Sequence, residues 1–169
     1  MPTPDLLVTS LDFAAPQRLS AEELVDHLST NGNWFEASIG PVRAQHEFLA
    51  EYPFMNVEFH GRAGFSMLLF IDERSTGVLA AMRAELSKPS VYVCLGGQVI
   101  EKWPRELFLA REATVTVLQH FLSTAAQDPS FEWVRLDRFR RETIHAGGKG
   151  LIPLWDKLRA DPQFPFAAE

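Results

Sequence analysis

Two β-rich runs separated by a pair of glycines constrain the fold of this chain more than any other feature. The runs are residues 90–95 and 98–103, and Gly96 and Gly97 lie between them. A two-residue turn of type I′ needs positive φ at both central positions, which glycine adopts without strain. The pattern therefore predicts a β-hairpin, and its two strands are antiparallel.

Several other segments have the composition of strands. Residues 65–71 are almost continuously apolar, which is typical of a strand covered on both faces. A turn at residues 72–77 leads to a return strand at residues 78–82. Further strands are expected at residues 6–9, 34–39 and 131–136, whereas residues 42–51 are ambiguous between helix and loop.

Three segments are predicted to be helical. Ser20 followed by Glu23 forms a capping box, which starts a helix at about residues 21–30. A second helix covers about residues 111–124, and a short third helix covers about residues 153–160. Four apolar side chains of the second helix recur on one side and are expected to share a core with a tryptophan of the last strand: Val115, Leu118, Phe121, Leu122 and Trp133.

The order of these elements indicates the fold class. Helices do not alternate regularly with strands, and the hairpin requires antiparallel pairing. We therefore expect an α+β fold with a mainly antiparallel sheet of about five or six strands, and with helices packed on one face of that sheet. The length of 169 residues fits a single domain over residues 1–169.

The charge balance bears on the kind of partner. The chain has 16 basic and 22 acidic residues, for a net charge of -6. A nucleic-acid-binding protein needs a basic surface, which this overall charge opposes. The same charge attracts a basic partner, although a simpler interpretation is that it only keeps the protein in solution.

The residues that support redox, metal or nucleophilic chemistry are sparse. The single cysteine, Cys94, excludes an intramolecular disulfide, and an inert buried thiol is its expected role. No two of the five histidines lie four residues apart, so we expect no metal and no cofactor. Lys149 in the glycine-rich segment 147–150 is followed by Gly150 instead of Ser or Thr, which argues against a phosphate-binding loop.

Two further patterns concern location and surface. The first residues lack the basic and apolar regions of a secretory signal, and the apolar runs are too short to cross a bilayer, so a cytoplasmic protein is expected. Arg138, Arg140 and Arg141 follow a strand that contains aromatic residues, an arrangement found in single-strand binding proteins. Because Asp137 and Glu142 flank them, an ion-paired segment is the preferred interpretation.

The order of elements over residues 65–136 resembles a known family. A strand and a return strand precede the hairpin, residues 106–109 lead into a helix that contains Phe121 and Leu122, and a connection containing Pro129 precedes a strand with Trp133. This order is similar to the first numbered family of polymorphic-toxin immunity proteins, which accompany deaminase and nuclease toxins of bacterial secretion systems. The resemblance implies a protein that is not an enzyme and that binds a cognate toxin domain and covers its active site.

An inhibitor of a nucleic-acid-targeting toxin would gain from carboxylates that imitate phosphates. The candidate partner-binding residues are Glu51 and Glu58, which lie near aromatic residues, and Asp72 and Glu73, which lie on a predicted turn. Ordinary surface charge is the alternative interpretation for each of them. Alternative functions are a small unrecognised hydrolase and a non-catalytic regulatory adaptor.

Overall fold

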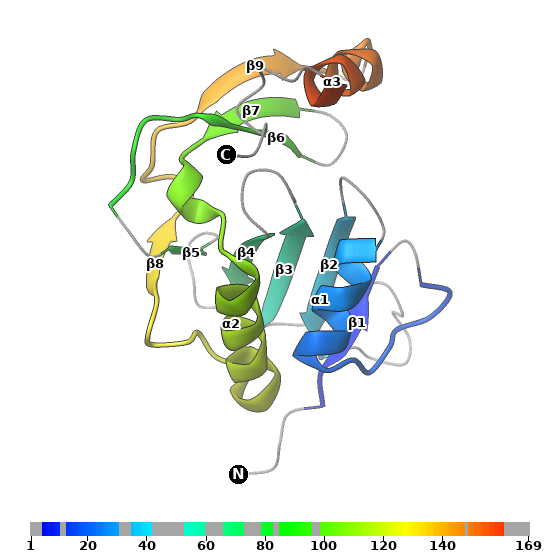
Figure 1. The fold of residues 1–169 in the computed structure, drawn as a ribbon. Coiled ribbons are helices and arrows are strands. Elements are labelled where there is room, and N and C mark those ends of the chain that lie inside the picture. The colour runs from blue at the N-terminus through cyan, green and yellow to red at the C-terminus, as the bar shows by residue number, and fades with distance from the viewer. Residues whose placement is uncertain are drawn as a thin grey trace.

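The computed structural model describes residues 5–10, 13–30, 35–41, 53–59, 66–72, 79–82, 85–95, 99–147 and 149–160. Figure 1 shows its helices and strands. In chain order they are β1 (Leu7–Thr9), α1 (Ala21–Thr30), β2 (Phe35–Gly40), β3 (Phe54–Phe59), β4 (Ser66–Ile71), β5 (Leu79–Met82), β6 (Val91–Leu95), β7 (Val99–Trp103), the 3₁₀ helix η1 (Arg105–Leu107), α2 (Arg111–Thr124), β8 (Glu132–Arg135), β9 (Glu142–Ala146) and α3 (Leu151–Ala160).

The strands form two sheets in which every pairing is antiparallel. The larger sheet has six strands in the order β1-β2-β3-β4-β5-β8, and the smaller has three in the order β6-β7-β9. Helices α1 and α2 lie in front of the larger sheet in Figure 1, and the smaller sheet lies at the top of the view. The predicted α+β class with a mainly antiparallel sheet is confirmed. The division of the strands between two sheets was not predicted.

Strand β4 belongs to two cores at once. Leu68 and Phe70 point to the face covered by the helices, whereas Met67 and Leu69 point to the opposite face and join the residues of the smaller sheet. Successive side chains of a strand alternate between its faces, so an apolar run is what a strand between two cores requires. The prediction that this run is covered on both faces is confirmed.

The first core lies between the larger sheet and the two helices. Phe121 of α2 is fully buried, and its ring meets that of Phe70 edge to face at 6.1 Å. The ring of Trp133 lies 5.9 Å from Phe70 on the same side. All five side chains expected to share a core contribute to this one, Leu118 and Phe121 from its interior and Val115, Leu122 and Trp133 from its margin.

The second core lies between the other face of the larger sheet, the smaller sheet and α3. Trp103 of β7 is its largest fully buried side chain, and it packs edge to face against Phe139 at 5.4 Å. Helix α3 contributes Leu151 and Trp155. Helices therefore cover one face of the larger sheet, and a second sheet covers part of the other.

Local sequence rules account for the helix boundaries. Helices α1 and α2 have the predicted bounds, and α3 begins at Leu151, two residues earlier than predicted. Pro153 is the third residue of α3, within the first turn, where its missing N–H is not needed. The turn before α3 contains Gly147 and Gly150 with φ of +108° and +80°, values that L side chains rarely adopt.

Three elements were not predicted: strands β3 and β9 and the 3₁₀ helix η1. Strand β3 directly follows Pro53, and β9 begins at Glu142, the end of the charged segment interpreted as ion-paired. The strands on both sides of Gly96 and Gly97 do pair, which confirms the hairpin. Leu95 lies opposite Val99, so three residues separate the paired ends instead of the predicted two, and the two glycines lie outside the described residues. No helix within the described part of the chain is long and apolar enough to cross a membrane.

Candidate interaction surface

Charge is distributed unevenly between the two parts of the molecule. Residues 1–84 and 110–135, which supply the larger sheet and its two helices, contain 14 acidic and 7 basic residues. Residues 85–109 and 136–169, which supply the smaller sheet and α3, contain 8 acidic and 9 basic residues. We call these the helix-covered half and the small-sheet half. The helix-covered half therefore carries all of the net negative charge of the chain.

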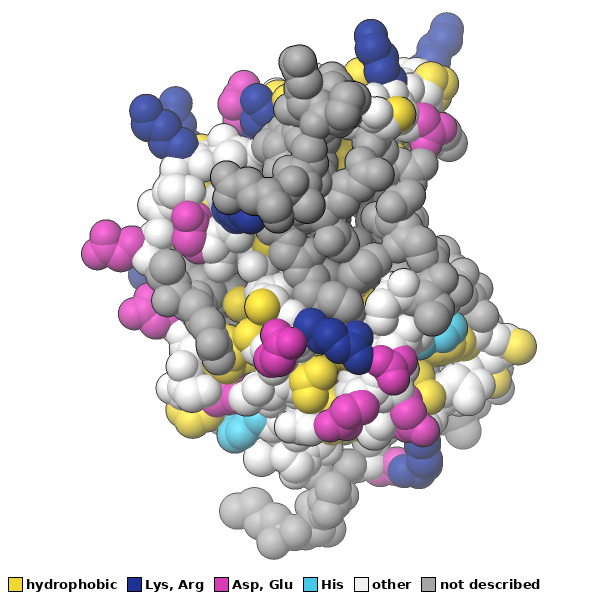
Figure 2. All heavy atoms as spheres, viewed as in Figure 1, with side chains coloured by type: hydrophobic (Ala, Val, Ile, Leu, Met, Phe, Trp, Pro, Cys, Tyr) yellow, Lys and Arg dark blue, Asp and Glu magenta, His cyan; other side chains and the backbone are white. Residues whose placement is uncertain are grey.

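The outer surface of the helix pair displays part of this charge. Figure 2 shows acidic side chains gathered where α1 and α2 face the viewer. Four exposed carboxylates form this surface, which we call the acidic helix face: Glu22, Glu23, Asp26 and Glu112. The opposite sides of both helices are buried in the first core, so amphipathicity fixes the direction in which the four carboxylates point.

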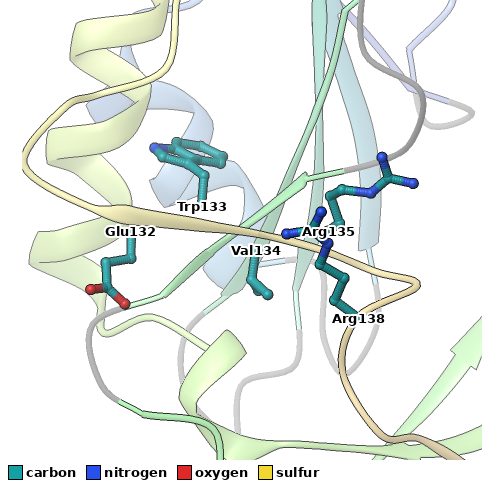
Figure 3. A pocket seen from close by; sticks show the side chains of 5 residues that line it. All are labelled: Glu132, Trp133, Val134, Arg135 and Arg138. Atoms are coloured by element: carbon teal, nitrogen blue, oxygen red, sulfur yellow. The ribbon is translucent and has the colours of Figure 1, made fainter.

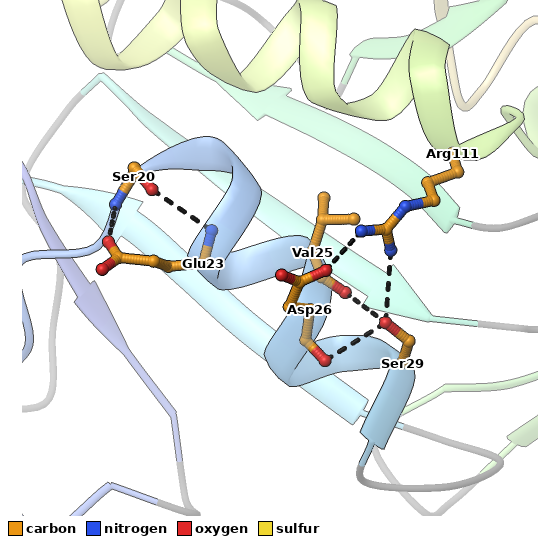
Figure 4. A network of polar contacts seen from close by, with 6 residues as sticks. All are labelled: Ser20, Glu23, Val25, Asp26, Ser29 and Arg111. Carbon is orange, nitrogen blue, oxygen red and sulfur yellow. Dashed lines mark hydrogen bonds and ion pairs between the residues drawn. The ribbon is translucent and has the colours of Figure 1, made fainter.

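Polar contacts hold the two helices together at both ends of the acidic helix face. Arg111, the first residue of α2, forms an ion pair with Asp26 and donates to the Ser29 hydroxyl at 3.3 Å (Figure 4). Gln119, two turns further along α2, donates to Glu22 near the start of α1. The helices therefore run antiparallel. These two contacts hold the carboxylates of Asp26 and Glu22.

The start of α1 is closed by a complete capping box. The Ser20 backbone N–H donates to the Glu23 carboxylate at 2.8 Å, and the Glu23 N–H donates to the Ser20 hydroxyl at 3.2 Å (Figure 4). Two hydrogen bonds with Ser20 lower the pKa of Glu23 below its ordinary value of 4.5. The backbone hydrogen bond has the larger effect, and the side-chain hydrogen bond has the smaller one. Glu23 is therefore ionised at neutral pH, as a charged contact surface requires.

The structure places only two of the four sequence-predicted acidic residues among the described residues. Glu58 lies on β3, opposite Met67 of β4, and is 7% exposed, so little of it is available to a partner. Asp72 is half-buried just after β4. Glu51 and Glu73 lie outside the described residues. The acidic helix face was missed because the sequence analysis looked for carboxylates on turns and near aromatic residues.

An open hollow of about 350 Å³ lies along β8, the last strand of the larger sheet (Figure 3). Five residues line it: Glu132, Trp133, Val134, Arg135 and Arg138. Trp133 lies on the opposite side of the strand from Glu132 and Val134. Four of the five lining residues come from the strand itself, so the hollow is a depression along a sheet edge and brings no distant groups together.

The basic run near this hollow is partly neutralised within the chain. Arg135 Nε donates to Asp137 at 2.9 Å, and this hydrogen bond lowers the pKa of Asp137 and raises that of Arg135. Arg141 lies 3.8 Å from the carboxylate of Glu101. Asp137 therefore pairs with Arg135, which precedes the basic run, and Arg141 pairs with Glu101, so these contacts are not the expected ones between the run and its flanking acids.

The histidines of the described residues occupy separate places. The His27 ring lies 4.8 Å from that of Phe13, and His145 Nε2 lies 2.9 Å from the Gly147 carbonyl oxygen. Within the described ranges, no three His, Cys, Asp or Glu side chains are grouped so that they could hold a metal ion.

Comparison of the chain with protein-family models, with curated proteins and with solved structures finds no match.

Proposed function

We propose that this protein is an immunity protein of the cytoplasm, which binds a cognate secreted bacterial toxin domain and covers its active site. The toxin would be a deaminase or nuclease that acts on nucleic acid. The observation that carries the proposal is the acidic helix face. The resemblance of residues 65–136 to an immunity family supports it.

The chemistry of such a toxin accounts for the charge. A protein that acts on nucleic acid binds phosphates through lysine and arginine side chains in its active-site groove. A surface that displays several carboxylates can occupy the same groove. Opposite charge on the two surfaces also steers the encounter, so the inhibitor associates quickly even with a toxin present at few copies.

The rigidity of the face favours tight binding. Side chains that must be ordered on association reduce affinity. Asp26 and Glu22 are already held by Arg111 and Gln119 in the free protein. We therefore expect nanomolar affinity or better, which corresponds to about -12 kcal/mol.

The proposal is tested with the toxin domain encoded beside the gene for this protein. The two are co-expressed, growth protection is scored, and association is measured by stopped-flow fluorescence at low and high salt. In the double variant Glu22→Lys with Glu112→Lys, we expect association at low salt to slow by about tenfold or more, and less at high salt.

A matched variant, Glu85→Lys with Glu132→Lys, makes the same change in charge at two exposed residues outside the acidic helix face. It should associate at a rate close to that of the parent protein. A third variant, Asp72→Lys with Glu73→Lys, tests the turn predicted from sequence. Equal slowing by all three would show that only net charge matters. Lack of any complex, or of a toxin gene beside this one, would refute the proposed function.

A further inference from the structure

Two edge strands, β1 of the larger sheet and β9 of the smaller sheet, differ in whether their outer backbone groups have partners. At β1 the outer edge is covered, because the N–H groups and carbonyls of Val8 and Gln17 bond to each other at 2.8 Å. In contrast, β9 pairs with β7 on one side only, and no described strand pairs with its other side. An edge strand of this kind offers backbone groups to a strand from another chain.

A β-bulge changes the direction of one side chain on this edge. Thr143 lies opposite Glu101 and His145 lies opposite Ile100, which leaves Ile144 as an extra residue in β9. A bulge changes the direction in which a side chain points. Among the described residues, Ile144 is the one large hydrophobic residue that is exposed, at 38%. Because a bulge also interrupts regular pairing, the edge suits a short added strand better than a long one.

Positive charge lies at the start of the same strand. A hollow of about 310 Å³ is lined by Lys88, Pro89, Arg140, Arg141 and Glu142. Three cationic groups therefore face one carboxylate, in a chain whose overall charge is -6. The hollow leads directly into β9, which begins at Glu142.

We propose that residues 140–144 bind a short, extended, acidic segment of a partner protein, which adds to the edge of β9. The backbone of the segment pairs with β9, its carboxylates lie over Lys88 and Arg140, and an apolar side chain covers Ile144. Main-chain hydrogen bonds supply affinity in this mode of recognition, and alternate side chains supply specificity. The proposal does not depend on the toxin-binding function.

The short length of the basic run favours a peptide over a nucleic acid. A nucleic acid is bound through several phosphate contacts, whereas Asp137 and Glu142 flank a run of only three arginines. Arg141 also lies 3.8 Å from Glu101, so part of its charge is already used within the chain. An acidic peptide can place its carboxylates beside Lys88 and Arg140 and avoid Glu142.

The test uses the full chain and a fluorescent synthetic peptide in which aspartate and valine alternate, with binding followed by anisotropy. We expect saturable binding that weakens as salt increases. A twin peptide with alternate backbone nitrogens methylated has the same charge but cannot form a full ladder, and it should bind at least about tenfold more weakly.

Protein variants locate the site. Lys88→Glu with Arg140→Glu should weaken peptide binding by about tenfold or more. The matched control, Lys149→Glu with Lys157→Glu, makes the same change at exposed residues that do not line the hollow and should bind as the parent does. Ile144→Ser should weaken binding without altering its dependence on salt. Circular dichroism verifies that each variant is folded.

Four outcomes would overturn the proposal. They are absence of saturable binding, equal binding of the methylated twin, equal weakening by the matched control, and displacement of the peptide by a single-stranded oligonucleotide that binds more tightly. Sedimentation velocity tests whether a second copy of the chain binds at this edge. A dimer of the parent protein that is lost in Lys88→Glu with Arg140→Glu would assign this edge to a second copy of the chain instead.

Discussion

The two halves of this molecule differ in the polar contacts that their buried residues make. In the helix-covered half, the buried polar contact between layers is neutral: the hydroxyls of Ser66 on β4 and Thr114 on α2 lie 2.6 Å apart. In the small-sheet half, a buried contact within strand β7 is charged: Glu101, 7% exposed, accepts a hydrogen bond from the indole of Trp103 at 2.8 Å. Both halves bury a carboxylate, since Glu58 of β3 is also 7% exposed, so they differ in the kind of contact and not in whether charge is buried.

The elements outside the two cores also differ. The first core is closed by the apolar faces of α1 and α2, so the outer sides of these helices can carry the acidic helix face. Strand β9 contributes no described side chain to either core, and Arg141, which precedes it, lies 3.8 Å from the buried carboxylate of Glu101. The acidic helix face is thus the outer side of elements that close a core, whereas the cationic residues lie beside a strand outside both cores.

The largest effect is expected from Phe121→Ala in the first core. The ring is fully buried against Phe70, so its removal should lower the free energy of unfolding by about 3–5 kcal/mol. A guanidinium titration measures the loss, and Leu122→Ala, at the margin of the same core, is the matched comparison and should cost less. A loss under about 1 kcal/mol for Phe121→Ala would mean that this core relaxes around the cavity.

A smaller effect is expected from Glu101→Leu in the second core. The Trp103 indole N–H would lose its acceptor in a buried place, at a cost of about 1–3 kcal/mol. Glu101→Gln retains an oxygen acceptor and should cost less, which separates the hydrogen bond from the charge. Unfolding followed by Trp fluorescence measures both. If Glu101→Leu were as stable as the parent, the carboxylate would contribute nothing to the second core.

The smallest effect is expected at the capping box of α1. Ser20→Ala should cost about 1 kcal/mol, because the Glu23 N–H loses its partner.

The pKa of Glu23 is lowered in the folded protein, so stability should also depend on pH. The contribution of Glu23 to stability is present above its ordinary pKa of 4.5 and is lost as pH falls through the lower pKa of the folded state. Thermal unfolding at neutral and acidic pH should therefore show a smaller deficit for Glu23→Gln in acid.

Sequence analysis located elements whose rules are local. The capping box at Ser20, the 3.6-residue periodicity around Leu118 and the glycine pair after Leu95 each depend on neighbouring residues, and all three predicted the correct element. Strand β9 could not be found in this way, because its side chains are mostly exposed and it is a strand only through its pairing with β7. Strand β3 does alternate, with Met55 and Val57 facing the first core, so its pattern was available.

The division into two sheets and the acidic helix face are non-local in the same sense. No sequence feature near β7 indicates that its second neighbour in the sheet is β9 and not a strand of the larger sheet. Likewise, Glu22 and Glu112 are 90 residues apart in the chain and become one surface only because α1 and α2 pack side by side. Glu58, predicted from neighbouring residues to contact a partner, is instead 7% exposed on a strand of the larger sheet.

The connection between β7 and β9 has a consequence for how the chain assembles. Strand β7 ends at Trp103 and β9 begins at Glu142, and the segment between them contains α2 and β8, which both pack on the larger sheet. Pairing of β9 with β7 closes a long loop, and this costs conformational entropy. The cost falls once α2 and β8 have docked on the larger sheet, because the free chain between β7 and β9 is then shorter. We therefore expect the third strand of the small sheet to be the last to join. Its amide hydrogens should exchange with solvent well before those of β4, which lies between the two cores.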